Sequence, residues 1–180
     1  MEARSQSPLL TEALIGGRLL VVPKHSDEIE LYGSLEEAEA RLAVARNMLA
    51  EKGDPETAER LLLVQKALRA VMTLLADPER GRGLVPRALA LLLEAARGLA
   101  EPTGWSLHGC SPEDAEMMLA STLVRRADRL VSRMAEKGLL DSESAGEASR
   151  LLSTISYVLY RLHWSLCRGG GAKKAAALVS

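Results

Sequence analysis

The stretch from Ser111 to Gly138 constrains the fold of this chain most strongly, because its apolar residues recur at the spacing of a packed helix. Intervals of three and four residues bring these side chains to one side of an α-helix, where a partner helix can cover them. They are Met117, Ala120, Val124, Ala127, Val131 and Met134. Ser111-Pro112-Glu113-Asp114 is a helix-starting signal, and Gly138 is a terminator. The sequence therefore predicts a long helix inside a helical bundle.

The same periodicity, together with capping residues, predicts four further helices. A capping box at Ser34–Glu37 is expected to start the first, Asp54-Pro55 the second, and Pro86 the third. Asp141 or Ser142 is expected to cap the last helix. Because the connections are short, neighbouring helices are expected to be antiparallel. The predicted fold class is all-α, a five-helix up-and-down bundle of the ferritin-like or four-helix-bundle type.

The pattern divides the chain into three parts. Residues 1–33 contain Gly16-Gly17 and Pro23, and predict an ordered but irregular N-terminal arm. Residues 34–168 are predicted to form the bundle domain, and residues 169–180, which begin with three glycines, a mobile tail. A chain of 180 residues is long enough for one domain with a continuous core.

Composition supports the bundle and excludes several classes of protein. The chain is 47% hydrophobic but has no Phe and only 3% aromatic residues, so Leu, Ala, Val and Met are expected to fill the core. A net charge of −1 argues against general nucleic-acid binding. No apolar run approaches the length of a membrane span, and the N-terminus with Glu2 and Arg4 does not resemble a signal peptide. We therefore expect a cytoplasmic protein that binds neither membrane nor nucleic acid.

A dense group of arginines in the fourth predicted helix is the main candidate for a functional site. It consists of Arg125, Arg126, Arg129 and Arg133. A bundle helix does not need this group for its own stability, and guanidinium groups bind phosphates bidentately. Glu36 and Glu37, near the start of another helix, are placed to orient such groups. The alternative is a solvated, salt-bridged face that includes Asp128, and the residues alone leave both interpretations open.

The other reactive side chains do not predict a site. His163 and Cys167 lie one helical turn apart and can bind a metal, but no second pair of ligands accompanies them. An ordinary helix surface or interface is favoured, and no metal site is predicted. Cys110 and Cys167 have no paired spacing, which predicts neither a disulfide framework nor a zinc knuckle. The spacing suggests no Ser/Cys–His–acid arrangement, no Glu-x-x-His di-iron site and no Gly-x-x-x-x-Gly-Lys loop.

Several short motifs, taken in order, resemble the corrinoid (cobalamin) adenosyltransferases of the propanediol-utilisation type. Tyr32–Glu37 resembles the family's Tyr-Gly-Thr-x-Asp-Glu-Leu, and Pro23-Lys24 resembles the Pro-Lys that precedes it. Trp105–Ser111 resembles the turn Phe-x-Leu-Pro-Gly-Gly-Thr. Ala120–Arg129 resembles Ala-Arg-Thr-x-x-Arg-Arg-Ala-Glu-Arg, and Ser149–Tyr160 the last-helix pattern Asn-Arg-Leu-Ser-Asp-x-Leu-Phe. The resemblance covers about residues 14–167.

The resemblance implies a reaction and an assembly. Members of this family transfer the adenosyl group of ATP to the cobalt of a reduced corrinoid and displace triphosphate. ATP with Mg and cobalamin are thus the implied small-molecule ligands. The family works as a homotrimer of five-helix subunits with ATP between adjacent subunits. Leu119 and Leu123 lie off the main apolar stripe and fit such an interface between the fourth and first helices.

The resemblance also implies roles for single residues. Arg125 is implied to bind the triphosphate, and Glu36 to be the acidic partner of an arginine. These two are the candidate catalytic residues.

The remaining implied residues bind the two substrates. Lys24, Arg126 and Ser149 are the further candidates for ATP binding. Trp105 and His108 are candidates for corrinoid binding. Trp105 would exclude the lower axial ligand, which leaves cobalt four-coordinate and easier to reduce to nucleophilic Co(I).

The sequence departs from the family pattern in several places. Met1–Ala13 contains no Gly and no Asp, whereas the family has a phosphate loop, Thr-x-x-Gly-Asp-x-Gly-x-Thr, in this region. Ser121 stands where the family has the arginine that pairs with the first acid, and Ser149 where it has an Asn. Trp105 replaces Phe, and His108 replaces Pro. An alternative function is therefore a divergent, non-catalytic trimeric bundle that binds a corrinoid, a nucleotide or a protein partner.

Overall fold

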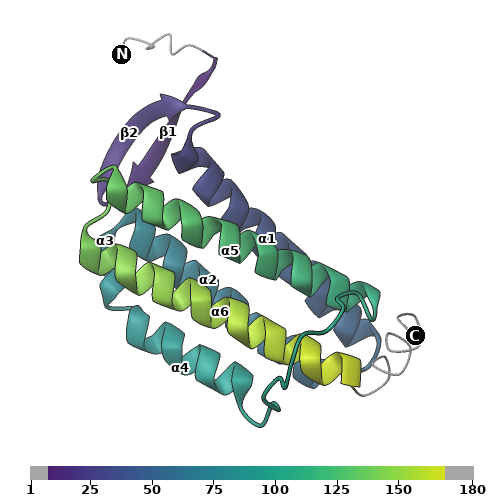
Figure 1. Ribbon diagram of the computed structural model, residues 1–180. Coiled ribbons are helices and arrows are strands. Elements are labelled where there is room, and N and C mark those ends of the chain that lie inside the picture. The colour runs from purple at the N-terminus through teal and green to yellow at the C-terminus, as the bar shows by residue number, and fades with distance from the viewer. Residues whose placement is uncertain (1–7, 169–180) are drawn as a thin grey trace.

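The computed structural model describes residues 8–168, which form a helical bundle with a small β-hairpin at one end (Figure 1). The elements are β1 (Leu10–Ile15), β2 (Arg18–Pro23), α1 (Asp27–Glu51), α2 (Pro55–Ala76), α3 (Pro78–Arg82), α4 (Val85–Ala96), α5 (Pro112–Glu136) and α6 (Ser142–Arg168). The predicted all-α bundle is confirmed in its main features. The count of five helices is not, because α3 adds a short helix. The predicted tail, 169–180, lies outside the described residues.

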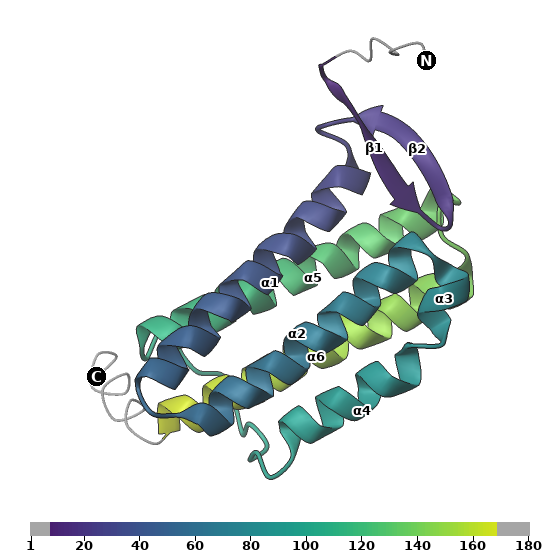
Figure 2. The ribbon, with the colours of Figure 1, turned by 180° about the vertical axis from the view of Figure 1, so that it is seen from behind.

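Four long helices make up the bundle, and a shorter helix covers one side of it. Helix α1 packs against α5 and α2, and α6 packs against α5 and α2. Helix α4 lies alongside α2 and α6, as Figure 2 shows from behind. Helices α1, α2, α4, α5 and α6 alternate in direction along the chain, which agrees with the antiparallel arrangement expected from the short connections.

The core lies along the apolar stripes that the sequence predicts. All six residues of the stripe in α5 are buried, from Met117 to Met134. The core cluster of the described residues consists of Leu, Ala, Val, Met and Ile side chains only, as the composition predicts. None of the helices within residues 8–168 combines the length and apolarity needed to cross a bilayer.

Helix α1 begins at Asp27 rather than at Ser34, so the predicted capping box is wrong. Ser26 is the N-cap in extended conformation, and Asp27, Glu28 and Glu30 lie in the first turn. Negative charges there are stabilised by the partial positive charge of the helix N-terminus. Ser34 is buried inside the helix, where its hydroxyl donates to Glu30 at 3.3 Å.

Residues 10–23 form an antiparallel hairpin, so the prediction of an irregular N-terminal arm is wrong for this segment. Gly16 and Gly17 join β1 to β2 with φ values of +60° and +75°. Two successive positive φ angles are what a tight two-residue hairpin turn requires. The same two N–H groups donate to the carbonyls of Leu75 and Ala76, both at 2.9 Å. The turn thereby satisfies carbonyls at the C-terminus of α2 that have no partner within the helix.

We expect Gly81→Ala to destabilise the fold, because Gly81 lies where α3 meets α2. A Cβ atom there would lie 2.2 Å from the Leu74 Cα, and backbone cannot move aside as a flexible side chain can. Overpacking of this kind costs about 1–3 kcal/mol. Urea unfolding followed by circular dichroism measures the change.

Gly146→Ala is the matched control for this experiment. Gly146 lies in α6, and an added Cβ would meet nothing within 4 Å. Alanine is favoured over glycine in a helix by roughly 1 kcal/mol, so this variant should be as stable as the wild type or more stable. Equal unfolding midpoints for the two variants would contradict the close approach of α3 to α2.

Candidate functional site

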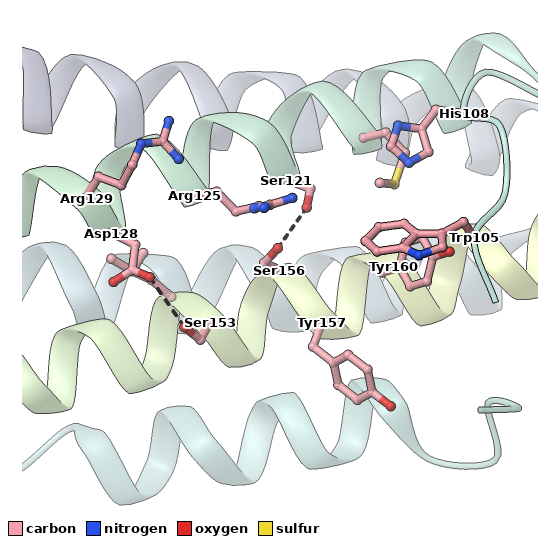
Figure 3. Close-up of a pocket in the computed structure, with 12 residues that line it drawn as sticks. Trp105, His108, Ser121, Arg125, Asp128, Arg129, Ser153, Ser156, Tyr157 and Tyr160 are labelled. Carbon is pink, nitrogen blue, oxygen red and sulfur yellow. Dashed lines mark hydrogen bonds between the residues drawn. The ribbon is translucent and has the colours of Figure 1, made fainter. Parts of the chain in front are cut away.

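A cavity of about 550 Å³ lies between α5, α6 and the loop that joins α4 to α5. Figure 3 shows that its lining divides into two ends. Arginines and a carboxylate lie at one end, aromatic rings lie at the other, and serines from α5 and α6 meet between them. The cavity therefore has one face suited to an anionic group and one suited to a flat, apolar group.

At the polar end, Arg125 and Arg129 line the cavity one helical turn apart on α5. Both are exposed, and neither has a hydrogen-bond or ion-pair partner in the part of the chain that the structure describes. Two guanidinium groups without a carboxylate partner leave all their donors available to a ligand. This arrangement is suited to binding a phosphate or another anion.

Arg126 and Arg133, the other two arginines of the group, are salt-bridged. Arg126 lies 2.7 Å from Glu30, and Arg133 lies 3.1 Å from Asp27. Both acids belong to the first turn of α1 and are in part exposed. The arginine group thus divides into two pairs with different surroundings. One pair is a solvated, salt-bridged face, and the other is unpaired and lines the cavity.

Asp128 brings an unsatisfied oxygen to the same end of the cavity. Its Oδ2 accepts from the Ser153 hydroxyl at 3.4 Å, whereas its Oδ1 is buried and has no hydrogen-bond partner among residues 8–168. A buried acceptor without a donor costs about 1–3 kcal/mol.

Ser121 is satisfied within the fold. Its hydroxyl lies 3.1 Å from that of Ser156, which joins α5 to α6 in the middle of the cavity (Figure 3). The family pattern has an arginine at this position. Two hydrogen-bonded serine hydroxyls therefore occupy the place where the family pattern has a positively charged arginine. Each hydroxyl is the other's hydrogen-bond partner, so neither is left unsatisfied.

At the aromatic end, the Trp105 side chain is 93% exposed. This value excludes an anchor in the core of the bundle. The Tyr160 ring lies beside it, with centroids 6.4 Å apart. The Tyr160 hydroxyl donates to the Gly104 carbonyl at 2.7 Å and so holds the loop that carries Trp105.

A buried network below the loop positions the aromatic end. The Asp114 Oδ2 accepts from the backbone N–H groups of Gly109 and Cys110, at 2.7 and 3.1 Å. Its Oδ1 lies 2.7 Å from His163 Nδ1, and His163 Nε2 lies 2.5 Å from the Ser106 hydroxyl. Both Asp114 and His163 are fully buried. His163 is therefore not on the helix surface but lies in the interface between α5 and α6.

A disulfide between Cys110 and Cys167 ties the same loop to the C-terminal end of α6. The sequence predicted no disulfide, because 57 residues separate the two cysteines and no local spacing pairs them. The antiparallel packing of α5 and α6 brings the start of one helix beside the end of the other. Cys167 is buried and hence is not a surface residue either.

His108 presents an uncharged imidazole to the cavity at neutral pH. Burial lowers its pKa below the usual value, and the nearby His163 lowers it further, while Asp114 acts in the opposite direction. The two rings are in edge contact, with centroids 5.1 Å apart. A neutral imidazole does not repel metal cations or other positive charge in the cavity.

The profile of a family described as cobalamin adenosyltransferase matches residues 11–166. The chain belongs to this family. The match extends from β1 almost to the end of α6 and so includes every residue that lines the cavity. Membership confirms the resemblance inferred from the motifs and indicates corrinoid adenosyltransferase function in general terms. A search of curated proteins gives no match.

In this member of the cobalamin adenosyltransferase family, the cavity gathers Arg125, Trp105 and His108 from the residues predicted by sequence. Glu36 on α1 and Lys24 after β2 are exposed and do not line it. The remaining two predicted residues also lie outside it. Ser149 lies on α6 one turn before the lining, and Arg126 lines a neighbouring hollow of about 410 Å³.

Other lining residues were not predicted as site residues. Ser153, Ser156 and Tyr160 follow Ser149 at intervals of four, three and four residues on α6. This polar row is a signal that the sequence carries, because the same spacing predicts a helix face. Tyr157 also lines the cavity, and its phenol donates to Glu101, which raises the pKa of Tyr157 above its usual value.

Proposed function

We propose that this protein transfers the adenosyl group of ATP to the cobalt of a reduced corrinoid. The supporting observation is the two-ended cavity, with unpaired arginines at one end and an exposed tryptophan at the other. In this reaction Co(I) attacks the 5′ carbon of ATP. A cobalt–carbon bond forms, the carbon–oxygen bond breaks, and the electron pair leaves with triphosphate.

Arg125 and Arg129 are the proposed binding groups for the triphosphate. Negative charge builds up on the leaving group as the carbon–oxygen bond breaks, and guanidinium groups already in place stabilise that charge. Mg²⁺ accompanies ATP, and the carboxylate of Asp128, which lines the cavity, is the proposed ligand for it. Arg126 is proposed to contribute less, since Glu30 already holds it.

Trp105 and His108 are the proposed corrinoid-binding residues. An indole ring against the lower face of the corrin excludes water and nitrogen ligands from cobalt. Four-coordinate cobalt is easier to reduce to Co(I) than cobalt with an axial ligand. The low pKa of His108 keeps a positive charge away from the metal at neutral pH.

The proposed assembly is a homotrimer in which a neighbouring subunit completes the site. Glu36 and Lys24 are exposed and lie outside the cavity of their own subunit. Leu119 on α5 is 48% exposed, although it is apolar. An interface that covers α5 and α1 would bury Leu119 and bring Glu36 and Lys24 near the cavity of the next subunit.

A non-catalytic binding function is the second candidate. The Ser121–Ser156 pair favours it, because this pair removes a positive charge that the family pattern has at the centre of the site. A cavity without that charge can still bind a corrinoid or a nucleotide while stabilising the transition state less.

Arg125→Ala is expected to abolish detectable binding of Mg-ATP. Each hydrogen bond to a charged group contributes about 1.5–3 kcal/mol, so the loss of a bidentate contact weakens binding by at least about a hundredfold. Isothermal titration calorimetry measures the affinity. Arg87→Ala is the control, because Arg87 is exposed on α4 and outside the cavity. Wild-type affinity in Arg125→Ala would place the nucleotide elsewhere.

Trp105→Ala is expected to abolish formation of four-coordinate cob(II)alamin. The visible spectrum of cob(II)alamin with excess wild-type protein and Mg-ATP should shift to that of the four-coordinate form. Trp105→Phe restores the aromatic residue of the family pattern and should retain the shift. If wild-type protein produces no spectral change at any concentration, the corrinoid role of Trp105 is wrong and the non-catalytic function is favoured.

Leu119→Asp is expected to convert a trimer into monomers, because a charge would replace an apolar side chain in the interface. Light scattering at micromolar concentrations measures the molar mass of both proteins. Leu93→Asp is the matched control, since Leu93 is also exposed but lies on α4. A monomeric wild-type protein over this range would contradict the proposed assembly.

A further inference from the structure

Four side chains with metal-binding groups converge at the base of the α4–α5 loop. The Sγ atoms of Cys110 and Cys167 and a carboxylate oxygen of Asp114 all lie within 4.8 Å of one another. His163 Nδ1 lies 2.7 Å from the Asp114 Oδ1 and 3.4 Å from the Cys167 Sγ. None of these four residues lines the cavity of the proposed adenosyl transfer.

The fold brings a second pair of possible metal ligands to His163 and Cys167. His163 and Cys167, one turn apart on α6, needed a second pair of ligands. Cys110 and Asp114 have the same separation along the chain and lie at the start of α5. Because α5 and α6 are antiparallel, the two pairs meet although their sequence positions are far apart.

We propose that these four side chains bind one zinc ion when the Cys110–Cys167 disulfide is reduced. Two thiolates, an imidazole and a carboxylate are ligand types that zinc accepts in a tetrahedral site. The metal would take the place of the direct contacts among the four groups. Their burial, apart from that of Cys110, is typical of a closed structural site.

The surrounding hydrogen bonds already orient the proposed ligands. Asp114 Oδ2 accepts two backbone N–H groups, which leaves Oδ1 to bind the metal. The Ser106 hydroxyl lies 2.5 Å from His163 Nε2 and can accept its proton, so that Nδ1 carries the lone pair. Metal-binding histidines usually have such a partner on the second ring nitrogen. Zinc binding would shift the ring proton of His163 from Nδ1, where Asp114 accepts it, to Nε2, where Ser106 accepts it.

Reduction is the step that creates the thiolate ligands. A dithiol reductant attacks one sulfur, the S–S bond breaks, and the reductant is oxidised to its own disulfide. The protein gains two electrons and two protons as two thiols, and both protons leave when zinc binds. Cys110 is an exposed residue, which gives the reductant access. The oxidised protein lacks both thiolates and is expected to bind no zinc at this position.

Zinc binding by the full-length protein tests the proposal and does not depend on adenosyl transfer. One sample is reduced with dithiothreitol and desalted without oxygen, and another is kept oxidised. Competition with a chromophoric chelator then measures zinc affinity and stoichiometry. We expect one zinc per chain in the reduced protein and none in the oxidised protein. Cobalt(II) in place of zinc should give a thiolate-to-metal charge-transfer band.

Cys110→Ser is the deciding variant, because Cys110 is exposed and its replacement leaves the core intact. We expect at least a hundredfold weaker zinc binding, with the helical circular dichroism spectrum retained. His163→Gln should lose affinity in the same way, and His25→Ala, which replaces an exposed histidine, should not. A reduced wild type without zinc would overturn the proposal. So would equal affinities of the reduced and oxidised proteins, or wild-type affinity in Cys110→Ser.

Discussion

The cavity depends on one buried carboxylate, that of Asp114 at the start of α5. A carboxylate removed from water is tolerated only when hydrogen bonds replace its solvation. Here backbone groups of the loop satisfy one oxygen, and His163 of α6 satisfies the other. One side chain therefore joins the loop, α5 and α6. The loop carries Trp105, so this carboxylate also determines where the aromatic end of the cavity lies.

The arginines of α5 show how neighbouring residues acquire different functions from their position on a helix. Arg125 and Arg126 are adjacent in sequence but point to different neighbours. Arg126 forms an ion pair with Glu30 of α1, which helps to align the two helices. Arg125 and Arg129, one turn apart, face the space between α5 and α6, and neither has an ion-pair partner within residues 8–168. The packing of α1 against α5 thus decides which arginines are paired with acids and which remain available to a ligand.

The helical core could be predicted from sequence because its signal is local. Each stripe, such as that from Met117 to Met134, repeats within a single helix and becomes buried as predicted. The hairpin was missed because its strands are short and two glycines there also fit an irregular loop. The start of α1 was misplaced because Ser34–Glu37 matches a capping pattern but lies inside the helix. The helix begins seven residues earlier, where Asp27 and Glu28 lie in its first turn. Family motifs identified Arg125, Trp105 and His108 as candidates, and all three line the cavity.

The sequence by itself determined the helices other than the short α3, the composition of the core and the family, since periodicity and ordered motifs are local features of the chain. Only the tertiary structure decided which arginines are unpaired, that Cys110 and Cys167 are bonded, and that Asp114, His163 and Ser106 form one network. The disulfide and the network join residues from the start of α5 or its loop to the end of α6, and the arginine pairs join α5 to α1. Contacts between distant segments depend on how antiparallel helices pack, and no local pattern in the chain encodes their register.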